Sequence, residues 1–287
     1  MIQDYAFFTC VNILLAWSVY VALLGGNLSF AQGAFMAIGC YGSGVLTTRA
    51  GVPLALAMPL AACLGAAVAV GIGLPALRVR GVYLILVTIG ITFCVRVLIE
   101  NTPFLGGVEG FGGMKGADHW TALIAVAAIG TLLALLSRSP LQRTLDAVRE
   151  DDRVAAALGI NVTYVKLLAF AAGAAIAAVA GAIYGHYLVF VRADNFDIGV
   201  SVFVVLYMIL GGVNNLLGPA LGATIMTLLP EYIRVLAEWR PTVFGLAIIV
   251  MLWFRPQGLL PFRLVTLRAG TLRAGKGRAA GGPGGPS

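Results

Sequence analysis

The sequence predicts an all-α fold, a polytopic bundle of transmembrane helices with about nine spans, within a range of roughly eight to ten. Of the 287 residues, 60% are hydrophobic and only 11% are charged, whereas an average soluble domain has roughly a quarter charged residues. The mean hydropathy is +0.96. The chain also carries 37 glycines, and small residues let membrane helices approach closely.

Apolar runs separated by charged residues or by Gly and Pro define the spans. They lie near residues 5–24, 30–48, 52–77, 82–100, 119–136, 165–190, 199–216, 219–236 and 241–254. The first span ends at Gly25 and Gly26, and the third ends just before Arg78. The second span contains several glycines, so we expect it to be partly irregular. These spans predict a single transmembrane domain over residues 1–262.

The distribution of basic residues predicts the orientation in the membrane. With the N-terminus outside, the segments 78–80 and 137–164, Lys166 and the C-terminal segment are cytoplasmic and hold 13 of the 19 basic residues. The outer segments then hold five, and Arg96 lies within a span. The opposite orientation would violate the positive-inside rule, so we expect the C-terminus in the cytoplasm.

Two loops and a tail complete the predicted organisation. The outer loop 101–118 is rich in Gly, whereas the cytoplasmic loop 137–164 is polar and helix-forming. In the basic tail, residues 263–287, Thr-Leu-Arg-Ala-Gly occurs twice and is followed by a run of Gly and Pro. Such a composition predicts disorder. We expect its charges to contact anionic membrane lipid, and no nucleic acid.

The cytoplasmic loop predicts one short, rigid helix. Residues spaced to share one helical face are Leu141, Leu145, Val148, Asp152 and Ala155. Gly159 is expected to end the helix in the left-handed conformation, with Ile160 as the apolar residue beyond it. Asn161 or Thr163 can then cap the next span. The pattern fits a solvated connector or a lever that enters another protein's groove.

A family resemblance favours the lever. Glu150, the triplet Ala155–Ala157 and Gly159 resemble the Glu-Ala-Ala…Gly coupling loop of ABC importer permeases. Together with Lys166–Phe170, this stretch resembles the M-type (LivM-like) permeases of branched-chain amino acid importers. Similar motifs follow the same order elsewhere, at residues 77–84, 210–219 and 254–259. Outside the coupling loop, the family's Gln-x-Ser-x-Gly-His pattern differs, reading here as Asn27, Ser29, Ala31 and Gln32.

The resemblance implies a transmembrane permease subunit of an ATP-driven importer for branched-chain amino acids or similar small solutes, in the bacterial inner membrane. It implies a second, LivH-like permease, two LivG/LivF-like ATPase subunits and a periplasmic solute-binding protein as partners. ATPase closure would move the loop helix and change access to the pathway. The residues expected to couple to the ATPases are Arg149, Glu150, Asp151, Ala155, Ala156, Ala157 and Gly159.

Polar positions and glycine breaks supply candidates for the translocation pathway. They are Asn27, Ser29, Gln32, Arg96, Gly211, Gly212 and Asn214. An ionisable residue within a span is a functional candidate, but Arg96 can also snorkel to the outer surface or pair with Glu100. The breaks at 25–27 and 211–215 can line a pathway, or they can be tight turns.

The sequence argues against an enzyme. None of the three lysines stands in a GxxxxGK[ST] frame, so we expect no bound cofactor, with ATP hydrolysed by partner subunits. The four cysteines lie singly in apolar runs, and no metal site is expected. The rival function is a stand-alone ion-coupled secondary transporter, which would need an acid embedded in the membrane. Every Asp and Glu here lies in a loop or near a span end.

Overall fold

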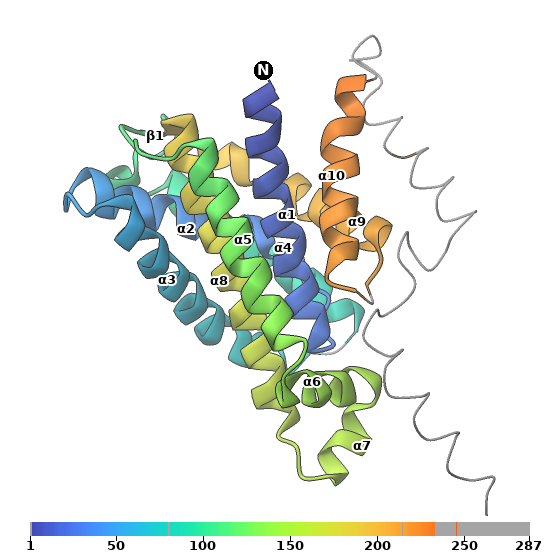
Figure 1. Cartoon of the computed structure of the whole chain (residues 1–287). Helices are drawn as coiled ribbons and strands as arrows, with labels where there is room; N and C mark the ends of the chain where they lie inside the picture. The colour runs from blue at the N-terminus through green and yellow to red at the C-terminus, as the bar shows by residue number, and fades with distance from the viewer. Residues whose placement is uncertain (1, 80, 214, 233–244, 246–287) are drawn as a thin grey trace, which may run out of the picture.

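The computed structural model describes residues 2–79, 81–213, 215–232 and 245, and these form a bundle of long helices with two short helices at one end (Figure 1). The predicted tail at 263–287 and, apart from residue 245, the predicted span at 241–254 lie outside the described residues, as does Asn214.

The long helices agree closely with the predicted spans. They are α1 (Ile2–Leu24), α2 (Gln32–Thr48), α3 (Leu54–Ala76), α4 (Val82–Glu100), α5 (His119–Leu136), α8 (Val162–Leu188), α9 (Ile198–Gly211) and α10 (Leu217–Tyr232). Six helical segments within the described part of the chain are long and apolar enough to cross a membrane: Gln3–Leu24, Leu54–Ala76, Val82–Glu100, His119–Leu136, Val162–Leu188 and Ala193–Gly211. The span predicted at 199–216 was too long, because Gly212 leaves helical geometry at φ 105°.

The Ala- and Gly-rich α8 lies at the centre of the bundle, where it packs against α1, α2 and α3. Small residues permit this packing. A Cβ added at Gly39 of α2 would overlap the backbone of Ala178, and one added at Gly181 would overlap Met36. The expectation that glycines allow close helix approach is confirmed at these two contacts.

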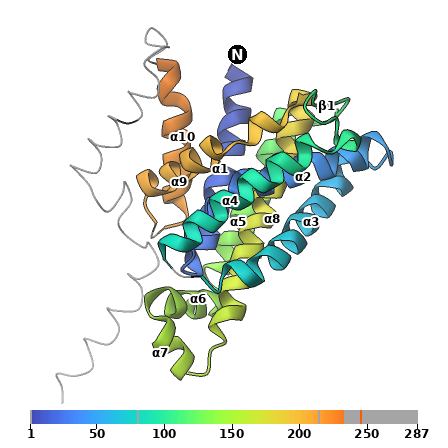
Figure 2. The same ribbon diagram turned by 180° about the vertical axis from the view of Figure 1, so that it is seen from behind.

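The peripheral helices α3, α4 and α5 expose large apolar side chains. Examples are Leu56, Leu60, Leu86, Leu98, Ile124 and Leu132. Seen from behind, α4 runs along the outside of the bundle (Figure 2). So much exposed apolar surface is typical of a protein that contacts membrane or partner chains.

The loops divide between the two ends of the bundle. At one end, α6 (Pro140–Glu150) and α7 (Asp152–Ala157) project below the long helices (Figure 1). At the other end, beside the N-terminus, β1 (Phe111–Gly112) pairs antiparallel with β2 (Phe190–Val191). Two 3-10 helices, η1 (Pro103–Leu105) and η2 (Ala193–Phe196), flank these strands in the chain.

Candidate functional site: the projecting helices and the broken span

The predicted loop helix is two helices, so the prediction of a single one was wrong. The break falls at Asp151, whose backbone is extended at φ −153° and ψ 111°. Its Oδ1 accepts hydrogen bonds from the backbone N–H groups of Arg153 (2.7 Å) and Val154 (3.2 Å). Asp favours this capping position because its side chain satisfies N–H groups that lack a helical partner. The local cap therefore outcompetes continuation of α6.

The predicted end of the loop helix is confirmed. Gly159 has φ 83°, and the Ile160 N–H donates to the Ala155 carbonyl oxygen at 3.1 Å, the long bond of a left-handed helix ending. Asn161, one of the two predicted caps, starts α8 by accepting from the Tyr164 N–H at 3.1 Å. Both ends of α7 are thus fixed by side-chain or backbone geometry.

The short helix α7 presents an apolar surface away from the bundle. Ala155 is buried, whereas Ala156 and Ala157 are exposed. Val154 is 57% exposed and Leu158 is 73% exposed. These two larger side chains were not among the predicted coupling residues, although their spacing of four residues placed them on one helical face.

Two polar links attach the projecting helices to the bundle. The Arg149 Nη1 of α6 donates to the Val213 carbonyl oxygen in the α9–α10 turn at 3.3 Å. The Lys166 Nζ of α8 pairs with the Asp152 Oδ2 of α7 at 2.5 Å. Asn27 Nδ2 in turn donates to the Lys166 carbonyl oxygen at 3.3 Å. The α1–α2 connection is thus linked through Lys166 to α7.

A polar cavity of about 550 Å³ lies among these links. Its lining includes Gly26, Asn27, Leu84, Arg149, Asp152 and Lys166. The cavity thus joins the first glycine break to both projecting helices and to the start of α4. It is the place where the predicted coupling residues meet one of the predicted pathway residues.

The second glycine break lies at the same end of the bundle. A Cβ at Gly211 would overlap the Gly218 carbonyl, so the α9–α10 connection is a tight turn. Gly211 and Gly212 adjoin Val213, whose carbonyl accepts from Arg149. These two glycines therefore lie close to the end of α6.

The candidates Asn27, Ser29 and Gln32 lie together in the connection between α1 and α2. All three are buried. The Ser29 Oγ accepts from the Ala31 N–H at 3.1 Å, and the Gln32 Oε1 accepts from the Ser18 Oγ of α1 at 3.2 Å. Helix α2 begins at Gln32 and continues without a break to Thr48 through all four of its glycines, so the expectation that glycines make the second span irregular was wrong. Of the predicted span, only residues 30 and 31 lie outside the helix.

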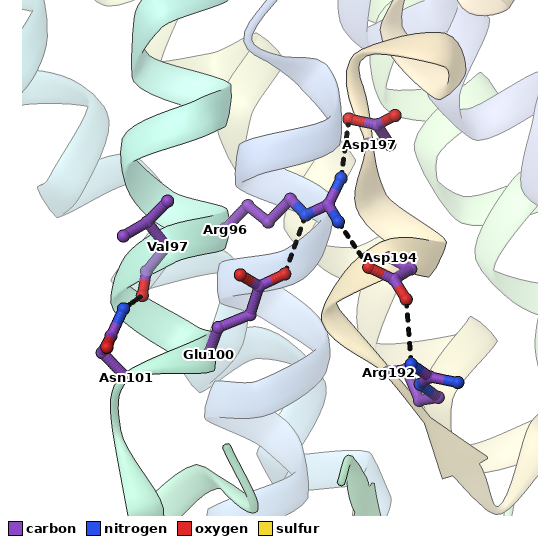
Figure 3. A network of polar contacts seen from close by, with 7 residues as sticks. All are labelled: Arg96, Val97, Glu100, Asn101, Arg192, Asp194 and Asp197. Carbon is purple, nitrogen blue, oxygen red and sulfur yellow. Dashed lines mark hydrogen bonds and ion pairs between the residues drawn. The ribbon is translucent and has the colours of Figure 1, made fainter. Parts of the chain in front are cut away.

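Arg96 lies at the opposite end, in an ion-pair cluster shown in Figure 3. Its Nε pairs with Glu100 at 2.8 Å, its Nη2 with Asp194 at 2.5 Å and its Nη1 with Asp197 at 3.3 Å. The pairing with Glu100 was one of the predicted alternatives. The two aspartates were not predicted as partners, because they lie about 100 residues away along the chain. The cluster joins α4 to η2 and to the start of α9.

Comparisons with known proteins agree on one family. The family model described as "Branched-chain amino acid transport system / permease component" matches residues 1–253. The chain is 32% identical to the high-affinity branched-chain amino acid transport system permease protein LivM of Salmonella typhimurium, over 90% of this chain and 69% of the relative. For LivM of Escherichia coli the identity is 31% over the same shares.

A second type of permease in such systems is also similar. The permease protein LivH of Escherichia coli is 32% identical over 49% of this chain and 48% of its own length. No solved structure matches the chain.

Proposed function

The chain belongs to the family of permease components of branched-chain amino acid transport systems, and on this premise we propose that it is the transmembrane subunit of an ATP-driven importer. Its solutes would be branched-chain amino acids or chemically similar small molecules. Separate ATPase subunits would supply the energy, because the sequence contains no phosphate-binding loop of the GxxxxGK[ST] type.

The main observation in support of this proposal is the exposed apolar surface of α7. A capped helix of six residues projects from the bundle with Val154 and Leu158 exposed. A short apolar helix face of this kind suits a groove on another protein. We assign that groove to an ATPase subunit, and we assign Arg149, Glu150, Asp151, Ala156, Ala157 and Gly159 to the contact or its geometry. Buried Ala155 would instead seat α7 against the bundle.

The links behind α7 suggest how its movement reaches the membrane helices. The Asp152–Lys166 ion pair connects α7 to α8, and α8 packs against α1, α2 and α3. The Arg149–Val213 hydrogen bond connects α6 to the α9–α10 turn. Displacement of the projecting helices would therefore act on both glycine breaks, in a change of access driven by ATPase closure.

We propose that the end bearing α6 and α7 is cytoplasmic and that the end bearing β1 and β2 faces outward. The excess of basic residues supports this orientation. With it, we propose about nine spans and a cytoplasmic C-terminus. A solute-binding protein would dock at the outer end, in a bacterial inner membrane. The similarity to LivH over about half of the chain supports a LivH-like second permease as partner, with two ATPases related to LivG and LivF below.

We place Asn27, Ser29 and Gln32 on the translocation pathway, with Arg96 near its outer end. Irregular backbone within a membrane protein commonly lines a solute route. Gly211 and Gly212 belong to the pathway's cytoplasmic end, because they lie beside Arg149. The neighbouring Asn214 remains a candidate on sequence grounds alone.

The first test replaces the apolar surface of α7. Val154→Asp and Leu158→Asp should prevent co-purification of co-expressed ATPase subunits and abolish ATP-driven leucine uptake, because a charge would enter an apolar contact. The matched control is Arg143→Asp, which places the same charge on an exposed position of α6. Normal co-purification and uptake in both α7 variants would refute the proposed contact.

A second test distinguishes the ATP-driven importer from the ion-coupled secondary transporter. The purified chain, reconstituted alone in vesicles, should neither hydrolyse ATP nor accumulate labelled leucine in response to a proton or sodium gradient. Addition of the ATPase subunits, the second permease and the binding protein should produce ATP-dependent uptake. Gradient-driven accumulation by the chain alone would favour the secondary transporter.

A further inference from the structure

The connection between α1 and α2, residues 25–31, is here called the α1–α2 break. Its backbone is not helical, and a broken backbone within a membrane protein needs partners for its N–H and C=O groups, because lipid supplies none. Phe30 lies in this segment with neither group in a helical ladder. The partners of its two backbone groups show what holds the break in place.

Both partners of Phe30 come from one face of α4. The Phe30 N–H donates to the Thr88 Oγ1 at 3.1 Å. The Thr92 Oγ1, one helical turn further along, donates to the Phe30 carbonyl oxygen at 3.0 Å. Thr88 is fully buried and Thr92 is 2% exposed, whereas Phe30 is partly buried, so the two hydroxyls hold these bonds from the inner side of the contact. We call this arrangement the threonine clamp.

The hydrogen-bond directions are consistent for both threonines. Thr88 has one hydroxyl proton, which it donates to the Ile85 carbonyl oxygen at 2.8 Å, leaving its lone pairs for the Phe30 N–H. The Thr92 hydroxyl lies 3.0 Å from the Phe30 carbonyl and 3.2 Å from the Thr88 carbonyl, so it can donate to either. The clamp on the Phe30 carbonyl can therefore open without stranding the hydroxyl, because the alternative acceptor belongs to α4 itself.

The α1–α2 break is also held at both of its ends. Towards α2, the Gly33 N–H donates to the buried Ser201 Oγ of α9 at 2.9 Å. Towards α1, Asn27 bonds to Lys166, the residue that pairs with α7. A movement of α7 would therefore reach the break through Lys166. The threonine clamp holds the break on α4.

We propose that Thr88 and Thr92 are positioning residues for transport: their clamp on Phe30 fixes the α1–α2 break in this state and opens when access to the pathway changes. The proposal rests on the proposed transport function. Individual hydrogen bonds of this kind are exchanged more readily than a continuous helical ladder, and helix breaks in transporters are where solute and conformation are coupled.

The test uses the complete transport complex. Thr88→Val and Thr92→Val remove the hydroxyls with little change in shape, whereas Thr88→Ser and Thr92→Ser keep them. Thr131→Val is the matched control, because this exposed threonine of α5 bonds to Ala127 of its own helix. Uptake of labelled leucine is measured per folded permease, together with ATP hydrolysis.

The Val variants should lower maximal uptake about tenfold or more, since each removes the side-chain partner of a partly buried Phe30 backbone group. Hydrolysis of ATP should continue, so solute transported per ATP should fall. The Ser variants and Thr131→Val should behave like the parent. The proposal is overturned if uptake per folded Val variant is normal, or if Ser fails to rescue it. Loss of folded protein in both single Val variants also overturns it, because the hydroxyls would then serve folding alone.

A second measurement, the accessibility of a cysteine in the α1–α2 break, does not require ATP-driven transport. A Leu28→Cys reporter in a background without the four native cysteines is reacted with a small thiol reagent. Its labelling rate should rise about tenfold when Thr88→Val and Thr92→Val are combined, because the break is released. An unchanged rate refutes the clamp. Loss of ATP-driven uptake in the parent complex would instead refute the proposed function, and the two failures remain distinct.

Discussion

Arg96 lies among three carboxylates at the end of α4, and this position explains how a charge is tolerated inside an apolar span. Glu100 comes from the next turn of the same helix, whereas Asp194 and Asp197 come from η2 and the start of α9. Opposite charges at this range offset the cost of placing an arginine in a span. The i, i+4 pair with Glu100 follows from local helix geometry, but the other two contacts depend on the packing of α4 against η2.

Gly159 is the residue at which backbone conformation can be tested most directly. At φ 83°, a Cβ would meet no neighbouring atom within 4 Å, so substitution strains the backbone without a steric clash. Gly159→Val should cost about 1–2 kcal/mol in the end of α7 and should uncouple ATP hydrolysis from uptake.

The control for Gly159→Val is Gly159→Asn, because Asn adopts the left-handed conformation more readily. It should retain more uptake at matched permease levels, and the milder Arg153→Gln should transport nearly as well as the parent. Normal uptake by Gly159→Val would mean that α6 and α7 act as a solvated connector.

At the scale of the element, the separation of α6 from α7 depends on one side chain. The Asp151 carboxylate caps α7. The Asp151 backbone N–H donates to the Ala147 carbonyl oxygen in the last turn of α6, which ends there. A helix of six residues is too short to persist alone, so its cap and its buried Ala155 largely determine its stability.

Removal of this cap should loosen α7. Asp151→Ala should destabilise the helix by about 0.5–2 kcal/mol, seen as faster amide hydrogen exchange at Arg153 and Val154. Asp151→Asn keeps an oxygen acceptor and should exchange at nearly the parent rate. If Asp151→Ala shows unchanged protection at both amides, the capping carboxylate does not maintain the break.

For the whole molecule, the division of loops between two ends predicts their accessibility across the membrane. In a background without the four native cysteines, Lys115→Cys should react with an impermeant maleimide on intact spheroplasts. Arg138→Cys should react only in inverted vesicles. Both positions are exposed in the structure, so folding does not hide either thiol. Labelling of Arg138→Cys but not Lys115→Cys on spheroplasts would reverse the proposed orientation.

The helical membrane class, most helix bounds and the ending of α7 at Gly159 could all be predicted from the amino-acid sequence. Hydropathy and helix endings act within about 20 residues of chain, so they can be inferred without knowledge of neighbouring helices. The confirmed cap at Asn161 has the same local origin. The motif between residues 150 and 170 was enough to indicate the family.

Which polar groups meet depends on how the helices pack and could not be predicted from the sequence. Thr88 and Thr92 are inconspicuous in an apolar span until α4 packs beside Phe30, and Lys166 becomes a link only when α7 folds back towards α8. The two aspartates beside Arg96 likewise approach through packing. Such contacts join residues from 14 to about 100 positions apart. They form because polar groups taken out of water must find partners that lipid does not supply.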